Sequence, residues 1–216
     1  KKINLDNYSK DKKFLFEKDL SFLFEFFESD KGEKFVNQYN QPIKRNSNIK
    51  IQGHNYAKFY DEYFFDKRKN DSNILEIGSF YGNAAAALYF YFKNAKIYSA
   101  DIFPDLFSYT SDRIKNFYVD SSSEKSIYQN ILKMEKKFEI IIEDACHAYK
   151  DQIISLFMLF PILNSGGIFI TEELDFPDTR ADMNLNNEKP TLRDILLSIK
   201  SGENFENSLI FKDQKD

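Results

Sequence analysis

Carboxylates and a histidine gather after two apolar stretches in the second half of the chain. Asp144 and His147 stand three positions apart after the first stretch, and Glu172 and Glu173 follow the second directly. If the two stretches are neighbouring parallel strands, these side chains meet at one edge of a sheet. Clustered carboxylates raise one another's pKa unless a cation neutralises them, and oxygen ligands suit a hard ion such as Mg²⁺. The sequence therefore predicts that Asp144, Glu172 and Glu173 hold Mg²⁺ or another hard divalent ion.

His147 is the candidate catalytic base beside that ion. An unperturbed imidazole titrates near neutral pH, which suits removal of a proton from a hydroxyl. Structural roles remain open: Asp144 as a helix N-cap, the glutamates on a solvated loop, and His147 as a bystander. Cys146 is disfavoured as a nucleophile, because a buried cysteine usually behaves as a small apolar residue. A zinc site is disfavoured because one Cys and two His do not provide its usual ligands.

A turn framed by two glycines follows the first apolar strand. Gly78 and Gly82 allow a small ligand to approach this turn, which leads into an alanine-rich helix. The turn lacks the dinucleotide fingerprint, because Phe80 stands where that motif needs its second glycine. Glu76 places a carboxylate just before the turn, which disfavours phosphates and suits an ammonium group. A cofactor that carries an amino acid, S-adenosylmethionine, is therefore favoured over NAD.

Two further acids stand at the ends of expected strands. Asp101 follows the second strand, where a carboxylate can accept hydrogen bonds from ribose hydroxyls. Asp120 ends the third strand, where it can accept a hydrogen bond from the adenine amino group. Each acid alone is weak evidence, because acids after strands also cap helices and turns. The predicted cofactor-binding residues are Glu76, Gly78, Ser79, Tyr81, Gly82, Asp101, Asp120 and Ser121.

Short apolar strands alternate with helices from residue 73 onward. A continuous apolar run such as residues 140–142 is typical of a parallel strand that is buried on both faces. Right-handed crossovers then give an α/β fold with a doubly wound, Rossmann-like, mostly parallel sheet. The expected strands cover residues 74–77, 95–100, 116–119, 138–143, 167–171 and 209–211. The expected helices cover residues 83–92, 123–136, 149–163 and 191–199, with a loop before Pro190.

Residues 1–70 are expected to form a helical N-terminal arm or lid, before a catalytic domain of residues 71–216 that binds S-adenosylmethionine. One face of an expected helix carries Phe16, Leu20, Leu23 and Phe27. Further phenylalanines widen this face, so that the helix needs cover on more than one side: Phe14, Phe22, Phe24 and Phe26. Packing against the main domain is the favoured cover, and a homo-oligomer contact through this Phe-rich arm is the alternative. A second helix is expected over residues 56–65.

The composition indicates an enzyme-sized globular chain. It has 216 residues and a formal net charge of −4, which gives no electrostatic footprint for nucleic acid. The longest apolar run, residues 84–92, is shorter than the roughly 20 residues that a membrane-spanning helix needs. We expect no signal peptide, and a single Cys fits a reducing compartment. The predicted protein is cytoplasmic, has no membrane span or nucleic-acid partner, and binds a small-molecule or saccharide acceptor.

Several stretches carry a family resemblance: residues 29–32, His54-Asn55-Tyr56 with Tyr60, the 75–83 turn, Asp144-x-x-His147 with Tyr149 and Gln152, residues 165–167, and Glu172-Glu173. Together they resemble the class I S-adenosylmethionine-dependent methyltransferases, and more narrowly a metal-dependent sugar O-methyltransferase branch. The resemblance implies the same three Mg²⁺ ligands and His147 as the base. It also implies methylation of a sugar hydroxyl in bacterial surface-polysaccharide or natural-product biosynthesis. The family's acidic pair is commonly Glu-Asp, whereas this chain has Glu-Glu.

The sequence leaves other functions open. The same machinery could methylate a small non-sugar acceptor such as a catechol, because acceptor pockets are built from loops. A non-catalytic Rossmann-like binding module and an NAD-dependent oxidoreductase are further alternatives. Amino methylation of nucleic acid is disfavoured, because its Asn/Asp-Pro-Pro-aromatic signature is absent after the fourth strand.

Overall fold

The computed structural model describes residues 2–36 and 50–210. The chain divides into two compact units. The first unit is formed by residues 1–72, 79–99 and 105–115, and the second by residues 73–78, 100–104 and 116–216. Within the described ranges, none of the helices is both long enough and apolar enough to cross a membrane.

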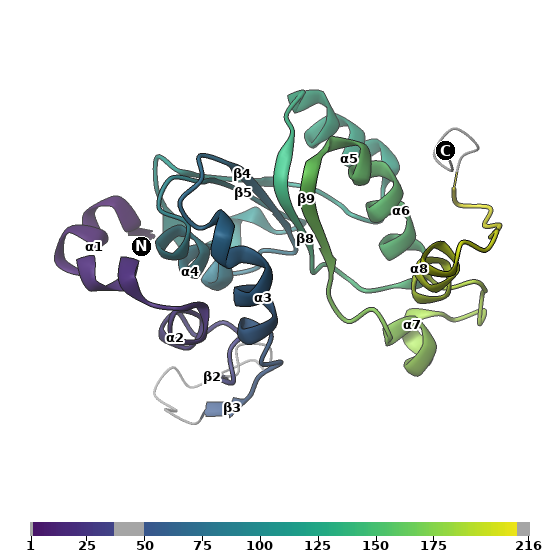
Figure 1. The fold of residues 1–216 in the computed structure, drawn as a ribbon, viewed down its shortest axis with the longest axis horizontal. Helices are drawn as coiled ribbons and strands as arrows, with labels where there is room; N and C mark the ends of the chain where they lie inside the picture. Colours follow the sequence, from purple (N-terminus) through teal and green to yellow (C-terminus); the bar gives the residue numbers. More distant parts are fainter. Residues whose placement is uncertain (1, 37–49, 211–216) are drawn as a thin grey trace. The chain divides into compact units, whose positions relative to one another are not determined.

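The described residues form the helices and strands drawn in Figure 1. The helices are α1 (Leu5–Asp11), α2 (Leu20–Phe26), α3 (Ala57–Phe64), α4 (Asn83–Tyr91), α5 (Glu124–Asn130), α6 (Tyr149–Leu159), α7 (Phe176–Thr179) and α8 (Leu192–Ser201). The strands are β1 (Ile3–Asn4), β2 (Lys34–Val36), β3 (Lys50–Gln52), β4 (Asn73–Ile77), β5 (Lys96–Asp101), β6 (Tyr109–Thr110), β7 (Ile114–Tyr118), β8 (Phe138–Glu143) and β9 (Leu163–Thr171).

The central sheet has five strands in the order β7-β5-β4-β8-β9. β4 pairs in parallel with β8, and β8 pairs in parallel with β9. The chain therefore winds from β4 through β5 and β7 on one side and through β8 and β9 on the other, as in a doubly wound sheet. Ile140, Ile141 and Ile142 of β8 are fully buried, which explains the continuous apolar run. The prediction of an α/β, Rossmann-like fold is confirmed.

In the second unit, α6 packs against α5, β9 and α8, and Figure 1 shows α5 and α6 beside β8 and β9. A buried apolar cluster joins α6 to the C-terminal segment and contains Tyr149, Ile153, Leu156, Leu192, Ile195 and Ile210. Helix α8 begins with a capping box, in which Thr191 and Asp194 each bond the other's backbone N–H through their side chains. The capping box fixes the first turn of α8, whose Leu192 and Ile195 belong to the cluster.

Several predicted boundaries are wrong by a few residues. Helix α5 ends at Asn130 and α6 ends at Leu159, both earlier than predicted, and β9 begins earlier, at Leu163. A 3-10 turn at Phe160–Ile162 follows α6, and Pro161 within it offers no N–H for a further α-helical hydrogen bond.

The predicted C-terminal strand is also wrong as far as the structure describes it. Leu209 and Ile210 lie in a turn, in which the Ile210 N–H donates to the Asn207 carbonyl at 3.2 Å. Phe211, the last residue of that prediction, lies outside the described residues.

In the first unit, α2 packs against α3 and α4. The long helix predicted through this region is interrupted, because a 3-10 turn at Lys13–Glu17 precedes α2. Asp19 is the N-cap of α2, and its carboxylate accepts the Phe22 N–H at 2.8 Å. The cap stops the helix from extending backwards. Helix α3 lies close to the range predicted for it.

The predicted cover of the phenylalanines holds for only part of the set. Phe24 is fully buried, but the Phe14, Phe22 and Phe26 residues are 47%, 40% and 37% exposed. These three rings contact one another, with Phe22 and Phe26 stacked. The expectation that all of them are covered by the rest of this chain is therefore wrong.

Candidate active site

Three neighbouring strands end level with one another at the site. Ile77, Glu143 and Thr171 are paired across β4, β8 and β9, so the residues that follow leave the sheet together. Two further hydrogen bonds extend the ladder, from the Asp144 N–H to the Ile77 carbonyl and from the Glu172 N–H to the Glu143 carbonyl, each 2.9 Å. The two acidic segments thus emerge at the carboxyl edge of the sheet, where α/β sheets bind ligands.

Asp144, His147 and Glu173 form a compact group of side chains at this edge. One candidate ligand atom from each lies within 4.8 Å of the other two. His147 Nε2 is 3.7 Å from Asp144 Oδ1 and 3.7 Å from Glu173 Oε2. The structure thus brings three of the predicted residues together. Glu172 is buried but does not belong to this group, so its role as a ligand stays a prediction.

Two members of the group have a left-handed backbone conformation. The angle φ is 60° at His147 and 46° at Glu173. This conformation costs a non-glycine residue about 1 kcal/mol or more, and it persists only where surrounding contacts hold it. Such residues cluster at functional sites, and the two positive φ angles therefore mark the segments that carry them as candidate functional loops.

Glu143, which is not among the predicted site residues, is a fully buried carboxyl group next to them. Burial and, to a smaller degree, the nearby Asp151, Glu172 and Glu173 carboxylates raise the pKa of Glu143 to about 8. Its Oε2 has no hydrogen-bond partner among the described residues. The only signal in the sequence is an acidic residue at the end of an otherwise apolar strand.

Replacing Glu143 with glutamine should remove a pH dependence of stability. The pKa of Glu143 is raised on folding. Between pH 4.5, its ordinary pKa, and about pH 8, the folded chain therefore keeps a proton that the unfolded chain has released. The free energy of unfolding of the metal-free protein should therefore fall as the pH rises through this window, and Glu143→Gln should lack that contribution. Urea denaturation at several pH values measures both slopes. An equal dependence of the unfolding free energy on pH in the wild type and in Glu143→Gln would contradict the raised pKa of Glu143.

Cys146 belongs to the same loop but has no nucleophilic character. Its thiol donates a hydrogen bond to Asp151 Oδ2. Partial burial raises the pKa of Cys146 to about 12, and the hydrogen bond to Asp151 raises it too. A thiol that stays protonated at neutral pH is unreactive. The residue itself is exposed, so the reason given from the sequence, burial of the cysteine, is wrong.

Gly78 lets the turn after β4 pass close to the Asp144 segment. Its φ is +90°, and an added Cβ would lie 1.8 Å from the Asp144 carbonyl oxygen. Its N–H donates to the Ala100 carbonyl at 2.8 Å. Only glycine satisfies both the backbone angle and the close approach at this position.

Gly78→Ala should destabilise the chain strongly, by about 2–5 kcal/mol from the strained angle and the backbone clash together. Gly166→Ala is the matched control, since Gly166 also has a positive φ, of +74°, but an added Cβ would meet nothing within 4 Å. The control should cost only about 1 kcal/mol. Urea denaturation of both variants measures the difference, and equal losses would refute the close approach.

The rest of the turn has the tight form that its glycines predict. The Gly82 N–H donates to the Ser79 carbonyl at 2.7 Å, and Gly82 has φ of +80° directly before α4. An added Cβ at Gly82 would lie 2.4 Å from the Phe107 ring. The Tyr81 carbonyl accepts the Ser108 N–H at 2.9 Å. Cofactor binding by Ser79, Tyr81 and Gly82 stays a prediction.

The predicted acids lie at the strand ends, as expected. Glu76 and Asp101 are buried in β4 and at the end of β5, and Asp101 Oδ1 accepts the Phe103 N–H at 2.7 Å. Asp120 Oδ1 accepts the Ser122 N–H at 3.0 Å and its hydroxyl at 2.6 Å, so this carboxylate also stabilises a local turn. Ser121 is buried beside it. Contacts from these residues to ribose and adenine stay predictions.

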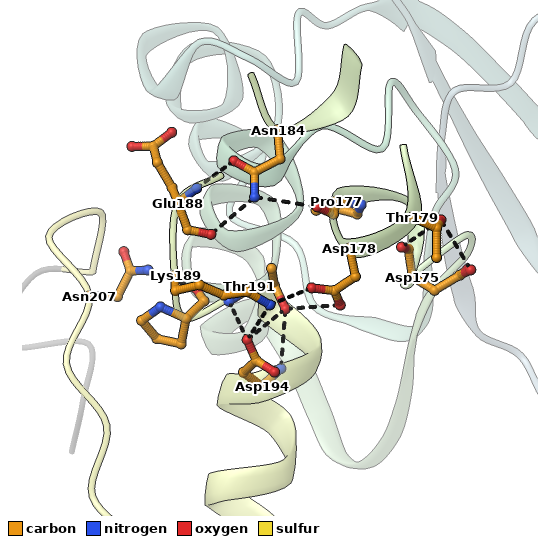
Figure 2. A network of polar contacts seen from close by, with 11 residues as sticks. Asp175, Pro177, Asp178, Thr179, Asn184, Glu188, Lys189, Thr191, Asp194 and Asn207 are labelled. Atoms are coloured by element: carbon orange, nitrogen blue, oxygen red, sulfur yellow. Dashed lines mark hydrogen bonds and ion pairs between the residues drawn. The ribbon is translucent and has the colours of Figure 1, made fainter. Parts of the chain in front are cut away.

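The segment after the acidic pair is held by the polar network in Figure 2. Lys189 Nζ donates to Asp178 Oδ1 at 2.6 Å and to Asp194 Oδ2 at 3.1 Å. Asn184 bonds the backbone of Glu188 in both directions, donating at 3.0 Å and accepting at 2.8 Å. The sequence predicted only a loop over these residues. The network could not be predicted, because side-chain contacts between separate turns of a loop leave no periodic pattern in the sequence. The network gives this loop a defined path between β9 and α8.

The residues present fit the predicted metal and cofactor. Two carboxylates that converge on one point are ligands that a hard divalent ion accepts, and the His147 imidazole lies beside them. The turn at Gly78, which a Cβ would fill, and the buried Glu76 and Asp101 at neighbouring strand ends fit a small cofactor with amino and hydroxyl groups.

Comparison with known proteins finds methyltransferases that are similar to this chain. No family model matches the sequence. The chain is 27% identical over 128 residues to the 8-demethyl-8-alpha-L-rhamnosyl tetracenomycin-C 2'-O-methyltransferase of Streptomyces olivaceus, across 56% of this chain and 33% of that protein. It is 26% identical over 128 residues to the mycinamicin VI 2''-O-methyltransferase of Micromonospora griseorubida, across 56% of this chain and 32% of that protein.

The fold is similar to that of MycE, a methyltransferase of the mycinamicin biosynthetic pathway. The structure of MycE with Mg and SAH has a TM-score of 0.67 and 21% identity, across 85% of this chain and 48% of that chain. The structure of MycE with Mg, SAH and mycinamicin VI has a TM-score of 0.66 and 20% identity. The chain covers about half the length of these solved relatives, and the aligned part is about a third of the curated ones. The chain thus has the class I methyltransferase fold, and its recognised relatives are sugar O-methyltransferases, as its motifs predict.

Proposed function

We propose that the chain is an S-adenosylmethionine-dependent, metal-assisted O-methyltransferase that acts on a sugar hydroxyl. The observation that carries this proposal is the group formed by Asp144, His147 and Glu173 at the carboxyl edge of the sheet. A methyltransferase fold supplies the donor site, and this group supplies what activation of an alcohol requires, a metal site and a base.

Asp144 and Glu173 would hold the divalent ion, with Glu172 as the third predicted ligand. When bound, the ion supplies positive charge that lowers the pKa of an acceptor hydroxyl. The chain's part is to keep the two carboxylates close together despite their repulsion, with Asp144 anchored through its backbone to β4. The neighbouring hydroxyls of a sugar ring suit such a site, because they can bind an ion together.

His147 would take the proton from the acceptor hydroxyl. Its Nε2 faces both carboxylates at equal distance, so a hydroxyl bound next to them has the imidazole within reach. The acceptor oxygen then forms a bond to the methyl carbon while the carbon–sulfur bond breaks, and S-adenosylhomocysteine leaves. In-line attack needs mostly positioning, which the fixed strand ends provide.

S-Adenosylmethionine would lie against the turn after β4 and the ends of β5 and β7. Glu76, Gly78, Ser79, Tyr81 and Gly82 are proposed to contact its amino-acid and sulfonium part. Asp101 would accept hydrogen bonds from the ribose, and Asp120 with Ser121 would contact the adenine. The place of these residues at successive strand ends supports this assignment.

The acceptor class is proposed from the relatives, whose names describe 2'-O-methylation of a rhamnosyl tetracenomycin and 2''-O-methylation of mycinamicin VI. A sugar of a natural product or of a bacterial surface polysaccharide is the proposed acceptor. A transfer assay with labelled S-adenosylmethionine, a panel of rhamnosides and a catechol tests it. We expect labelled sugar product only with Mg²⁺ and none after chelation. Labelling of the catechol alone would show that the acceptor is not a sugar. Turnover that survives chelation would refute the proposed role of the metal ion.

A further inference from the structure

Gln152 links helix α6 to the acidic loop. It is fully buried near the start of the helix, 20 and 21 residues before the two glutamates. Its Nε2 donates to the Glu173 carbonyl at 3.1 Å and lies 3.4 Å from the Glu172 carbonyl. Since carbonyl oxygens only accept, the amide nitrogen must face them and the orientation of this side chain is fixed.

These contacts restrain a backbone that would otherwise relax. Glu173 has a φ of 46°, and its carbonyl accepts from both Gln152 and the Phe176 N–H, the latter at 3.0 Å. Glu172 is held on both sides, since its N–H donates to the Glu143 carbonyl at 2.9 Å. Through one side-chain amide, Gln152 bonds the backbone of both residues whose carboxylates are proposed to hold the ion.

We infer that Gln152 is a positioning residue for the metal site. Its amide holds the Glu172-Glu173 backbone in the left-handed turn that directs the Glu173 carboxylate to Asp144 and His147. This inference rests on the proposed function, because it assigns Gln152 a role toward that function's ion. Residues that orient metal ligands typically contribute about 10- to 100-fold to metal affinity.

Gln152→Met and Gln152→Leu test the inference, because both replace the amide donor with an apolar side chain of similar volume. Ser155→Ala is the matched control. Ser155 lies one turn further along α6, is fully buried, and has a hydroxyl without a hydrogen-bond partner among the described residues. All three changes remove a buried polar group from the same helix, and only the Gln152 changes release the acidic loop.

Mn²⁺ binding, followed by electron paramagnetic resonance, is the first measurement. We expect Gln152→Met and Gln152→Leu to weaken it by about 10- to 100-fold, with Ser155→Ala within about twofold of the wild type. Turnover of the Gln152 variants should recover largely at high Mg²⁺, because the metal site is loosened and not removed. Hydrogen exchange of the metal-free proteins is the second measurement, and the peptide over residues 171–176 should exchange faster in the Gln152 variants only.

Wild-type Mn²⁺ affinity in a folded Gln152→Met or Gln152→Leu chain would overturn the inference while leaving the proposed function intact. Equal weakening by Ser155→Ala would also overturn it, because the effect would then belong to the helix as a whole. Absence of Mn²⁺ binding by the wild-type chain would refute the proposed function and this inference with it.

Discussion

Asp144→Asn should lower methyl transfer by about a hundredfold or more, since a bound ion contributes several kcal/mol to the transition state and each 1.4 kcal/mol is about tenfold in rate. The substitution keeps the shape of the side chain but removes its charge. It therefore weakens binding of the ion without disturbing the backbone hydrogen bond from the residue 144 N–H to the Ile77 carbonyl. Initial rates over a range of Mg²⁺ concentrations measure the effect.

Asp175→Asn is the matched control for this experiment. It makes the same chemical change on the loop after β9, at an exposed residue whose side chain bonds only Thr179 among the described contacts. Its turnover should stay near that of the wild type. If Asp144→Asn kept both its turnover and its Mg²⁺ dependence, Asp144 would not be a metal ligand.

His147→Ala should lower kcat by about a hundred- to ten-thousandfold, the range for loss of a positioned base. If His147 is the base, the variant should bind Mn²⁺ and S-adenosylhomocysteine with affinities close to those of the wild type. Single-turnover rates and separate titrations of the two ligands distinguish the chemical step from binding.

A large loss of Mn²⁺ affinity in His147→Ala would identify the imidazole as a ligand instead, and full activity would remove it from the mechanism. Cys146→Ser, at the neighbouring position, should retain turnover, because the protonated thiol takes no part in the reaction. Strong loss in that variant would contradict the argument from its raised pKa.

The sheet could be predicted because its strands carry their signal locally. Strand β8 has the predicted bounds, since a run of buried β-branched residues is typical of an inner parallel strand. The helix predicted around Phe16 and Leu20 was wrong as one element, because the cap at Asp19 competes with the apolar periodicity. Helix α6 was predicted too long, although Pro161 gave a signal for its end.

The site could be predicted as far as the strand ends determine it. Asp144 and Glu173 follow adjacent strands, so their proximity follows from sheet order alone. Which glutamate turns toward Asp144 depends on the positive φ at Glu173, and that angle is set by tertiary contacts. The Gln152 contacts and the raised pKa of Glu143 arise from burial among distant segments, which one sequence does not encode in any local pattern.

Nuclear relaxation of methyl-¹³C-labelled S-adenosylmethionine in the presence of Mn²⁺ tests the central claim directly, because a paramagnetic ion speeds the relaxation of a carbon only when the two are close together. With the wild-type chain, we expect fast relaxation of the bound methyl carbon, and Asp144→Asn should abolish most of it. A methyl carbon that relaxes at its diamagnetic rate while both ligands are bound would place the donor and the ion far apart, and the proposed metal-assisted transfer would then be wrong.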